Sequence, residues 1–336
     1  MKLRNLNLSL SNRCNASCIW CPKERGTKHN FDMPWELAKK IIDELADQPE
    51  HIKMIHLSEN GEALYNPDFL KIVRYTKEKL PNTAINLLSN FGLMTDEIAR
   101  ALLSEKLLSS VQVNIDGHDS DSYKAVKGIS YSSVVKHVKT FIALMEEFDP
   151  DFDFTINVMT AFEYAVTVSS FFGTTPDRYN DPIPYSSFDL SEESLRKFAP
   201  KNVRIRKSKS GLWAERNLVK KGFKPQHLNE SELSCPLLDR VQLEAFIAPN
   251  GDWYACCLDD NNDLVLGNVN ETSLHEIFHS HKRLEFLKKL EARQFEEIGY
   301  PCNTVVCCQT ISIPTESYNE MTKQFKPGDF IILKQE

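Results

Sequence analysis

Three cysteines lie close together near the start of the chain, in the sequence NRCNASCIWC. Cys14, Cys18 and Cys21 have the spacing C-x3-C-x2-C. A [4Fe–4S] cluster is normally held by four thiolates. Three thiolates would leave one iron with an open coordination position, and in zinc sites an open position separates a reactive metal from a structural one. The triad therefore predicts a reactive metal centre.

Other interpretations of the triad stay open on the residues alone. A zinc ion could bind the three cysteines together with a histidine such as His29, although this spacing is unusual for zinc. Cys18 and Cys21 could act alone as a C-x-x-C redox dithiol, which would leave Cys14 unexplained. A chance cluster of buried cysteines is disfavoured because the surrounding residues are polar. An open [4Fe–4S] cluster accounts for all three cysteines.

The nine cysteines of this 336-residue chain fall into two groups. Three lie at 14–21 and six lie between 235 and 308, with none in the long stretch between them. In an intracellular protein, cysteines point to metal or redox chemistry more than to structural disulfides. Core cysteines would be scattered more evenly, so the distribution predicts two separate sites.

The composition excludes several classes of protein. Hydrophobic residues make up 41% and charged residues 26% of the chain, as in a globular enzyme. The apolar runs are too short for a transmembrane helix, and residues 1–10 lack the features of a secretory signal, so we expect a cytoplasmic protein without a membrane partner. The net charge of -7 argues against a nucleic-acid partner. The one basic run, at 201–209, alternates apolar and charged residues and predicts a strand with one solvated face.

Strands and helices alternate along the first 160 residues. Strands are expected at 6–10, 52–58, 83–89, 110–116 and 152–160, with a sixth at 203–207. Helices are expected at 34–46, 67–80, 95–107, 119–126, 131–147 and 191–199, the last with Ser191 as its N-cap. Loops are expected at 165–188 and 210–234. Helices in the gaps between strands indicate an α/β fold whose parallel strands are covered by helices.

The C-x3-C-x-aromatic-C triad, placed after the first strand of such a chain, resembles the radical S-adenosylmethionine (radical SAM) superfamily. The resemblance covers residues 5–160 well and implies a partial (β/α)6 parallel barrel over residues 1–230. It implies that the open iron binds S-adenosylmethionine (SAM), whose reductive cleavage gives methionine and a 5′-deoxyadenosyl radical. That radical removes a hydrogen atom from the substrate. An electron donor such as a flavodoxin or ferredoxin would supply the electron.

Elements that contact SAM in this family recur at the ends of three later strands. The GGE-like element reads NGE at 60–62, the Ser/Thr-Asn-Gly element reads SNFG at 89–92, and the Ser-x-Asp-Gly element reads NIDG at 114–117. Each departs from the family pattern by one residue. Trp20 would pack near the cluster and the adenine. The expected cofactor contacts are therefore Trp20, Asn60, Gly61, Glu62, Ser89, Asn90, Asn114 and Asp116.

The C-terminal part resembles the SPASM/twitch extension found behind many radical SAM domains. Its opening has the pattern C-x15-G-x4-C, and residues 231–325 are expected to form a small auxiliary iron–sulfur domain with a β-hairpin turning at 249–251 and a helix at 273–292. Cys257 and Cys307 each adjoin another cysteine, and neighbouring strand residues point to opposite faces. The choices between Cys256 and Cys257 and between Cys307 and Cys308 stay open. The expected ligands of one closed auxiliary [4Fe–4S] cluster are Cys235, Cys256, Cys302 and Cys308, with a structural zinc ion as the alternative.

The resemblance also implies a class of substrate. Because the first strand begins at residue 6, there is no room before it for a peptide-recognition module, and the chain looks most like the twitch-type dehydrogenases that oxidise an alcohol of an aminocyclitol. A sugar-like small molecule is therefore expected. The alternatives are a peptide-modifying maturase that installs a crosslink, a thioether or an inverted centre, and a non-catalytic iron–sulfur or zinc protein. The catalytic base stays unassigned among candidates such as His118, Glu163, Tyr164 and Asp259.

Overall fold

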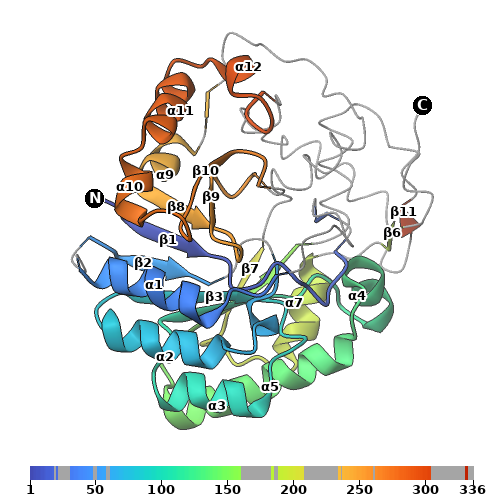
Figure 1. Ribbon diagram of the computed structural model, residues 1–336. Helices are drawn as coiled ribbons and strands as arrows, with labels where there is room; N and C mark the ends of the chain where they lie inside the picture. Colours follow the sequence, from blue (N-terminus) through green and yellow to red (C-terminus); the bar gives the residue numbers. More distant parts are fainter. Residues whose placement is uncertain are drawn as a thin grey trace.

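A parallel sheet forms the centre of the protein (Figure 1). The computed structural model describes residues 1–18, 20–21, 31–47, 51–57, 61–159, 183–184, 188–207, 234–235, 237–259, 262–303 and 330–331. Six strands pair in parallel in the order of the chain. They are β1 (Asn5–Leu8), β2 (Met54–His56), β3 (Ala84–Ser89), β4 (Ser110–Asn114), β5 (Asp153–Val158) and β7 (Arg204–Lys207). The predicted parallel α/β architecture is confirmed, and the strands that the structure describes form an open sheet.

Amphipathic helices cover one face of this sheet, as Figure 1 shows for α1, α2, α3 and α5. Alternate strand residues, such as Ile55, Val111 and Ile156, are buried and belong to one hydrophobic core with the apolar stripes of the helices. The helices that the structure describes between the parallel strands are α1 (Trp35–Ala46), α2 (Phe69–Lys79), α3 (Asp96–Ser104), α4 (Ser120–Lys127), α5 (Tyr131–Phe148) and α7 (Phe188–Arg196). The apolar periodicity read from the sequence therefore identifies the helix-covered face.

The C-terminal hairpin extends the same sheet. β8 (Glu244–Ile247) pairs in parallel with β1, and β9 (Asp252–Tyr254) pairs antiparallel with both β8 and β10 (Val265–Asn268). The resulting order is β10-β9-β8-β1-β2-β3-β4-β5-β7. The predicted hairpin and its turn are confirmed, with Gly251 at a φ of 90° in the turn. The sequence did not predict that β8 would join β1.

Glu244 links the first and last parts of this sheet. Its carboxylate accepts hydrogen bonds from the side chains of Asn5 at 2.9 Å and Asn7 at 3.0 Å, both on β1. It also accepts from Arg240 Nε at 3.0 Å, in the short helix α9 (Leu238–Leu243) that leads into β8. Burial would raise the pKa of Glu244, but these donors hold it below its ordinary value. The paired carboxylate fixes β8 beside β1.

Two predicted helices differ from those in the structure. The prediction of a single helix over 273–292 is wrong, because the segment forms two helices, α10 (Leu274–Phe278) and α11 (His281–Glu291). Ser280 caps the second helix, and its Oγ accepts a hydrogen bond from Arg283 N at 3.2 Å. α7 begins at Phe188, so Ser191 lies inside the helix instead of capping it. Phe188 packs against the core, which favours the earlier start.

The loop expected at 165–188 contains a short strand, β6 (Ile183–Pro184), which pairs antiparallel with β11 (Phe330–Ile331). The remaining residues expected to form loops lie largely outside the described residues, as does the expected domain boundary between residues 230 and 231. The chain continues from α11 into α12 (Phe295–Ile298).

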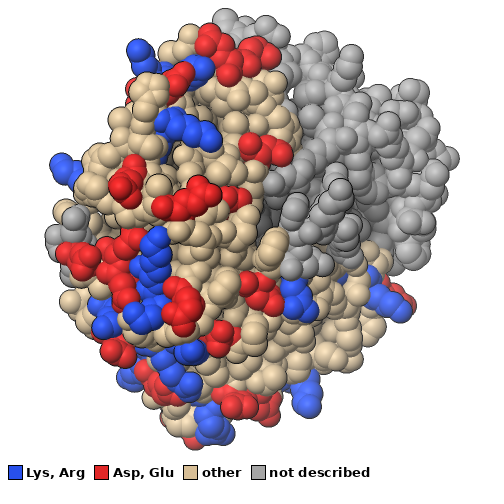
Figure 2. Space-filling model, in the orientation of Figure 1, with Lys and Arg blue, Asp and Glu red and all other residues tan. Residues whose placement is uncertain are grey.

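The surface carries both signs of charge. On the face shown in Figure 2, Lys and Arg side chains are interspersed with Asp and Glu over the described part of the chain. The expected strand with one solvated face is confirmed in β7, where Arg204 and Arg206 are exposed while Val203, just before the strand, is buried. Among the described helices, none combines the length and apolar character needed to cross a membrane.

Candidate active site

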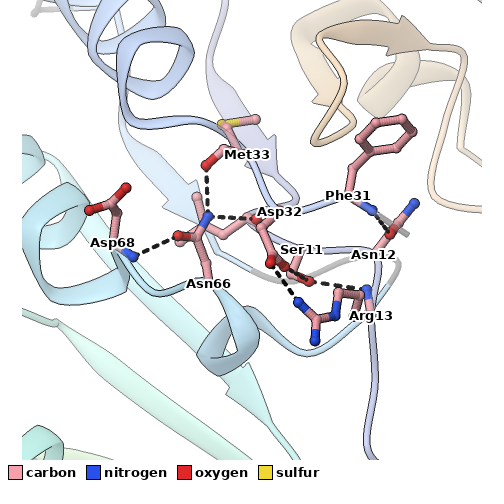
Figure 3. A network of polar contacts seen from close by, with 9 residues as sticks. Ser11, Asn12, Arg13, Phe31, Asp32, Met33, Asn66 and Asp68 are labelled. Atoms are coloured by element: carbon pink, nitrogen blue, oxygen red, sulfur yellow. Dashed lines mark hydrogen bonds and ion pairs between the residues drawn. The ribbon is translucent and has the colours of Figure 1, made fainter. Parts of the chain in front are cut away.

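A polar network anchors the segment that leads into the first three cysteines (Figure 3). Ser11 Oγ donates to Asp32 Oδ1 at 2.6 Å, and Arg13 Nη1 donates to Asp32 Oδ2 at 2.8 Å. Ser11 Oγ also accepts from the main-chain N–H of Arg13 at 3.0 Å. These contacts join the chain just before Cys14 to the chain that follows the cysteine loop, so both ends of the loop are held in place.

Asn66 ties the same two segments to a short 3-10 helix, η1 (Ala63–Tyr65). Its Nδ2 donates to the carbonyl oxygens of Leu10 at 2.8 Å and Met33 at 2.9 Å, and its Oδ1 accepts from Asp68 N at 2.8 Å (Figure 3). Asn66 is buried, so these bonds satisfy an otherwise costly group. Our sequence reasoning missed this residue, because a lone Asn in a loop carries no pattern.

Gly61 packs directly on the cysteine-bearing segment. A Cβ at position 61 would lie 2.2 Å from the carbonyl oxygen of Ser11, so only glycine permits this approach. The next residue, Glu62, donates its main-chain N–H to Arg13 O at 2.8 Å. The Gly61-Glu62 pair therefore lies against the cysteine segment, while Asn60 lies outside the described residues.

We expect Gly61→Ala to reduce both stability and cluster loading. The added methyl group must displace the backbone at Ser11, and overpacking of this kind costs about 1–3 kcal/mol. Thermal unfolding and iron content after anaerobic reconstitution measure the two effects. Gly299→Ala is the control, because a Cβ at Gly299 meets no atom within 4 Å although its φ of 86° is also positive. Equal iron content in the two variants would contradict the packing role of Gly61.

Glu62 collects hydrogen bonds from the end of β3. It accepts from Ser89 Oγ and from Asn90 N, each at 2.8 Å. The side chain is 2% exposed, and burial raises the pKa of Glu62 against the opposing effect of these donors. The structure thus brings together three residues that the sequence placed at two different strand ends.

Asn90 also contacts the cysteine segment. Its Nδ2 donates to Asn15 Oδ1 at 2.8 Å and lies 3.6 Å from Cys14 Sγ. Phe91, the residue inserted before the glycine, adopts a left-handed φ of 60°, and its ring is fully buried. Non-glycine residues rarely adopt this conformation, and the burial of the ring compensates for it. The insertion therefore leaves Asn90 facing the cysteine loop.

Asn114, the last residue of β4, and Asp116, just after it, have partners within the chain. Asn114 Oδ1 accepts from Asn157 Nδ2 at 3.1 Å. Asp116 is 2% exposed, lies 2.7 Å from Lys127 Nζ and accepts from Met159 N at 2.7 Å. Both carboxylate oxygens of Asp116 therefore have a partner in the protein.

Cys14, Cys18 and Cys21 lie in the loop that follows β1, and a turn connects Cys18 with Cys21. Cys21 N donates to Cys18 O at 3.1 Å, and Cys14 is exposed while Cys18 and Cys21 are half-buried. Trp20 is 7% exposed and joins the buried residues. Within the described part of the chain, no three His, Cys, Asp or Glu side chains are arranged to hold a metal ion as they stand. As a donor set, three thiols beside a buried carboxylate fit a cluster with one open iron.

The second group of cysteines lies partly in the core. Cys256 and Cys302 are each 5% exposed and belong to the hydrophobic core, and Cys235 packs against it. Cys257 is half-buried and lies 3.6 Å from Arg240 Nη1. The fourth expected ligand, Cys308, lies outside the described residues together with its neighbour Cys307.

The candidate bases have different surroundings. His118 Nε2 lies 3.1 Å from the Asp119 carboxylate. Asp259 is fully buried and accepts from the main-chain N–H groups of Asp263 at 2.8 Å and Leu264 at 2.9 Å, so it stabilises its own loop. Glu163 and Tyr164 lie outside the described residues.

Two family models match the chain in the order that the fold suggests. Residues 8–159 match the radical SAM superfamily, and residues 235–308 match SPASM, an iron–sulfur cluster-binding domain. The chain therefore contains a radical SAM domain, followed by a SPASM-type domain. The radical SAM domain implies a [4Fe–4S] cluster and SAM, and the SPASM-type domain implies an auxiliary iron–sulfur cluster.

Several known proteins are similar to this chain over part of its length. The tungsten-containing aldehyde ferredoxin oxidoreductase cofactor-modifying protein of Pyrococcus furiosus is 33% identical over 100 residues, which is 30% of this chain and 27% of that protein. The matched stretches span 27%, 39% and 42% of three curated relatives, so this chain spans less than half of their length.

Two solved structures share the fold over nearly the whole chain. BtrN in complex with AdoMet and 2-DOIA has a TM-score of 0.54 and 15% identity, and the match covers 93% of this chain and 94% of that one. The native protein anSMEcpe with bound AdoMet and Cp18Cys peptide has a TM-score of 0.55 and 13% identity, with 96% of each chain covered.

Proposed function

We propose that this radical SAM enzyme oxidises an alcohol group of a sugar-like or aminocyclitol-like small molecule. The observation that supports this is the polar face of the central sheet. On the side turned away from the helices, several strand residues carry amides, an imidazole or a guanidinium group, and the exposed Leu88 lies among them. We call this set the polar face; it comprises Asn7, His56, Asn86, Gln112, Asn114, Asn157 and Arg206.

Hydrogen bonds connect the polar face from β4 to β7. Arg206 donates to Gln112 Oε1 at 2.7 Å through Nη2 and to Asn157 Oδ1 at 3.1 Å through Nε. Asn157 in turn donates to Asn114 at the end of β4. Burial lowers the pKa of His56, so its imidazole is neutral at pH 7. Such groups can also donate to and accept from the hydroxyl groups of a bound substrate.

The chain's own residues then have defined tasks. When bound, the first cluster and SAM supply a 5′-deoxyadenosyl radical. We assign Cys14, Cys18 and Cys21 to that cluster, Glu62 to the ammonium group of SAM, and the polar face to the substrate hydroxyls. The substrate would give a carbon-bound hydrogen atom to the radical and its hydroxyl proton to a base. The auxiliary cluster, which Cys235, Cys256, Cys302 and Cys308 would hold, would accept the remaining electron, so that a carbonyl group is left. A flavodoxin or ferredoxin type of donor supplies the electron that starts each turnover.

Transfer of deuterium tests this proposal. The reconstituted enzyme is reduced anaerobically with SAM and with cyclitols and sugars that carry deuterium on the carbinol carbons. We expect methionine, singly deuterated 5′-deoxyadenosine and a carbonyl product, which mass spectrometry detects. Deuterium from the Cα or Cβ positions of a peptide panel, with none from the cyclitols and sugars, would replace alcohol oxidation by peptide modification. Peptide modification is the second candidate because a structure with the same fold is described with a bound peptide. Absence of methionine and 5′-deoxyadenosine would favour the non-catalytic alternative.

A further inference from the structure

A buried ion pair lies beneath the first cysteine loop. Lys127, the last residue of α4, is 3% exposed, and Asp116, just after β4, is 2% exposed. The ammonium and carboxylate groups are 2.7 Å apart. Removing two charges from water costs several kcal/mol for each ion, and apolar residues of similar volume often stabilise a fold equally well. Stability alone is therefore a weak reason for this pair.

The end of α4 is packed directly on the cysteine loop. Ser17, the residue before Cys18, donates its main-chain N–H to the carbonyl oxygen of Lys127 at 2.6 Å. A Cβ at Gly128 would lie 1.8 Å from Ser17 Oγ, so the two segments touch without room for a side chain. The backbone that carries Lys127 is thus fixed against the backbone that carries Cys18.

The ammonium group of Lys127 interacts with acidic groups on several elements. Burial would lower the pKa of Lys127, but Asp116 and then Cys18 and Tyr123 raise it well above its ordinary value. Burial raises the pKa of Glu62, and the positive charge of Lys127 opposes that rise. Lys127 therefore stays charged, and its field reaches both the cysteine loop and the expected SAM contact.

The neighbouring side chain of Tyr123 adds a second polar group to this buried region. Tyr123 is fully buried, and its hydroxyl oxygen has no hydrogen-bond partner among the described residues. The backbone of Tyr123 is held close to β4, because a Cβ at Gly117 would lie 2.8 Å from Tyr123 N. The segment with Asp116 and the helix with Lys127 are thus packed together tightly.

We propose that Lys127 is a positioning residue that makes one-electron reduction of the first cluster more favourable, with Asp116 as its fixed counter-ion. Reduction adds one negative charge, and a fixed cation in a region of low dielectric constant stabilises that charge. Buried charges and hydrogen bonds are known to set the potentials of iron–sulfur clusters. The inference rests on the proposed assignment of Cys14, Cys18 and Cys21 to this cluster.

The test compares variants whose charges change in opposite directions. Lys127→Met removes the positive charge and should lower the midpoint potential of the first cluster. Asp116→Asn leaves the ammonium unopposed and should raise it, and the double variant should return towards the parent. Each single change is expected to alter the ratio of reduced to oxidised cluster about tenfold at a fixed applied potential, or about 59 mV for one electron. Redox titration with dithionite, followed by electron paramagnetic resonance, measures the shift.

Matched controls separate the electrostatic effect from a loss of packing. Lys124→Met removes the same charge from an exposed position on α4 and should leave the potential unchanged. Lys127→Arg keeps the charge and should retain the parent potential. The auxiliary cluster in each sample serves as an internal reference, since its signal should not move.

Two results would count against the proposal in different ways. If Lys127→Met and Asp116→Asn both keep the SAM-responsive signal at the parent potential, the role of Lys127 is refuted while the cysteine assignment stands. If Cys18→Ala keeps that signal, the assignment itself fails. If Lys127→Met does not take up a cluster, Asp116→Asn and the double variant still test the proposal. Only an electrostatic role of Lys127 predicts that Asp116→Asn raises the midpoint potential and that the double variant returns it towards the parent value.

Discussion

A Cys14→Ala variant is expected to lose SAM cleavage while it keeps the auxiliary cluster. With one thiol missing, two thiols remain to hold the first cluster, and loss of a direct ligand should exceed the effect of about 10- to 100-fold seen when only supporting residues are removed. The parent should contain about eight irons per chain and the variant about four. Iron and sulfide content and the yield of 5′-deoxyadenosine measure both effects.

Cys235→Ala is the matched control for this experiment. It should also lower the iron content to about four per chain, because it removes a ligand of the auxiliary cluster. It should nevertheless retain the change in cluster spectrum that SAM causes and the formation of 5′-deoxyadenosine without substrate. If Cys14→Ala keeps full SAM cleavage, the assignment of the N-terminal triad is wrong. A parent protein with about four irons would overturn the two-cluster interpretation instead.

Glu62→Gln is expected to weaken SAM binding about 10- to 150-fold, the equivalent of about 1.5–3 kcal/mol for a hydrogen bond to a charged group. The physical reason is that the buried carboxylate is the proposed partner of the SAM ammonium group. Glu78→Gln, at an exposed position on α2, is the control and should bind SAM as the parent does. Equilibrium binding of SAM to the oxidised, reconstituted enzyme measures the difference.

The pH dependence of SAM binding gives a second readout for Glu62. Burial raises the pKa of this carboxyl group, so it takes up a proton at a higher pH than an ordinary Glu does. The ionised form binds the ammonium group, and affinity should therefore fall as the pH is lowered through that pKa. Glu62→Gln should remove this pH dependence. A parent and variant with the same affinity and the same pH profile would show that Glu62 does not contact SAM.

Local patterns were sufficient to predict the parallel part of the fold. Apolar alternation and helical spacing identified six parallel strands and their helices, because burial on the helix-covered face imposes these periods. The meeting of Glu62 with Ser89 and Asn90 was also predictable, since residues at the carboxyl ends of neighbouring parallel strands lie at one edge of the sheet.

Contacts between distant segments were not predictable from the sequence. The pairing of β8 with β1 joins residues 239 positions apart, such as Asn5 and Glu244, and no local pattern records it. Lys127 was missed for a related reason. A lysine in the helical sequence SDSYKAVK resembles any solvated residue, and only the tertiary structure buries it beside Asp116.

The position of β1 has a consequence for how the protein folds. β1 lies between β8 and β2, so the strand that leads to the first cysteine triad is an interior strand only when the C-terminal hairpin is present. Without the hairpin, its N–H and C=O groups would line an unpaired edge that invites aggregation. The two domains therefore share one sheet, in which β8 pairs with β1. We expect the parallel strands and the C-terminal hairpin to unfold as one cooperative unit.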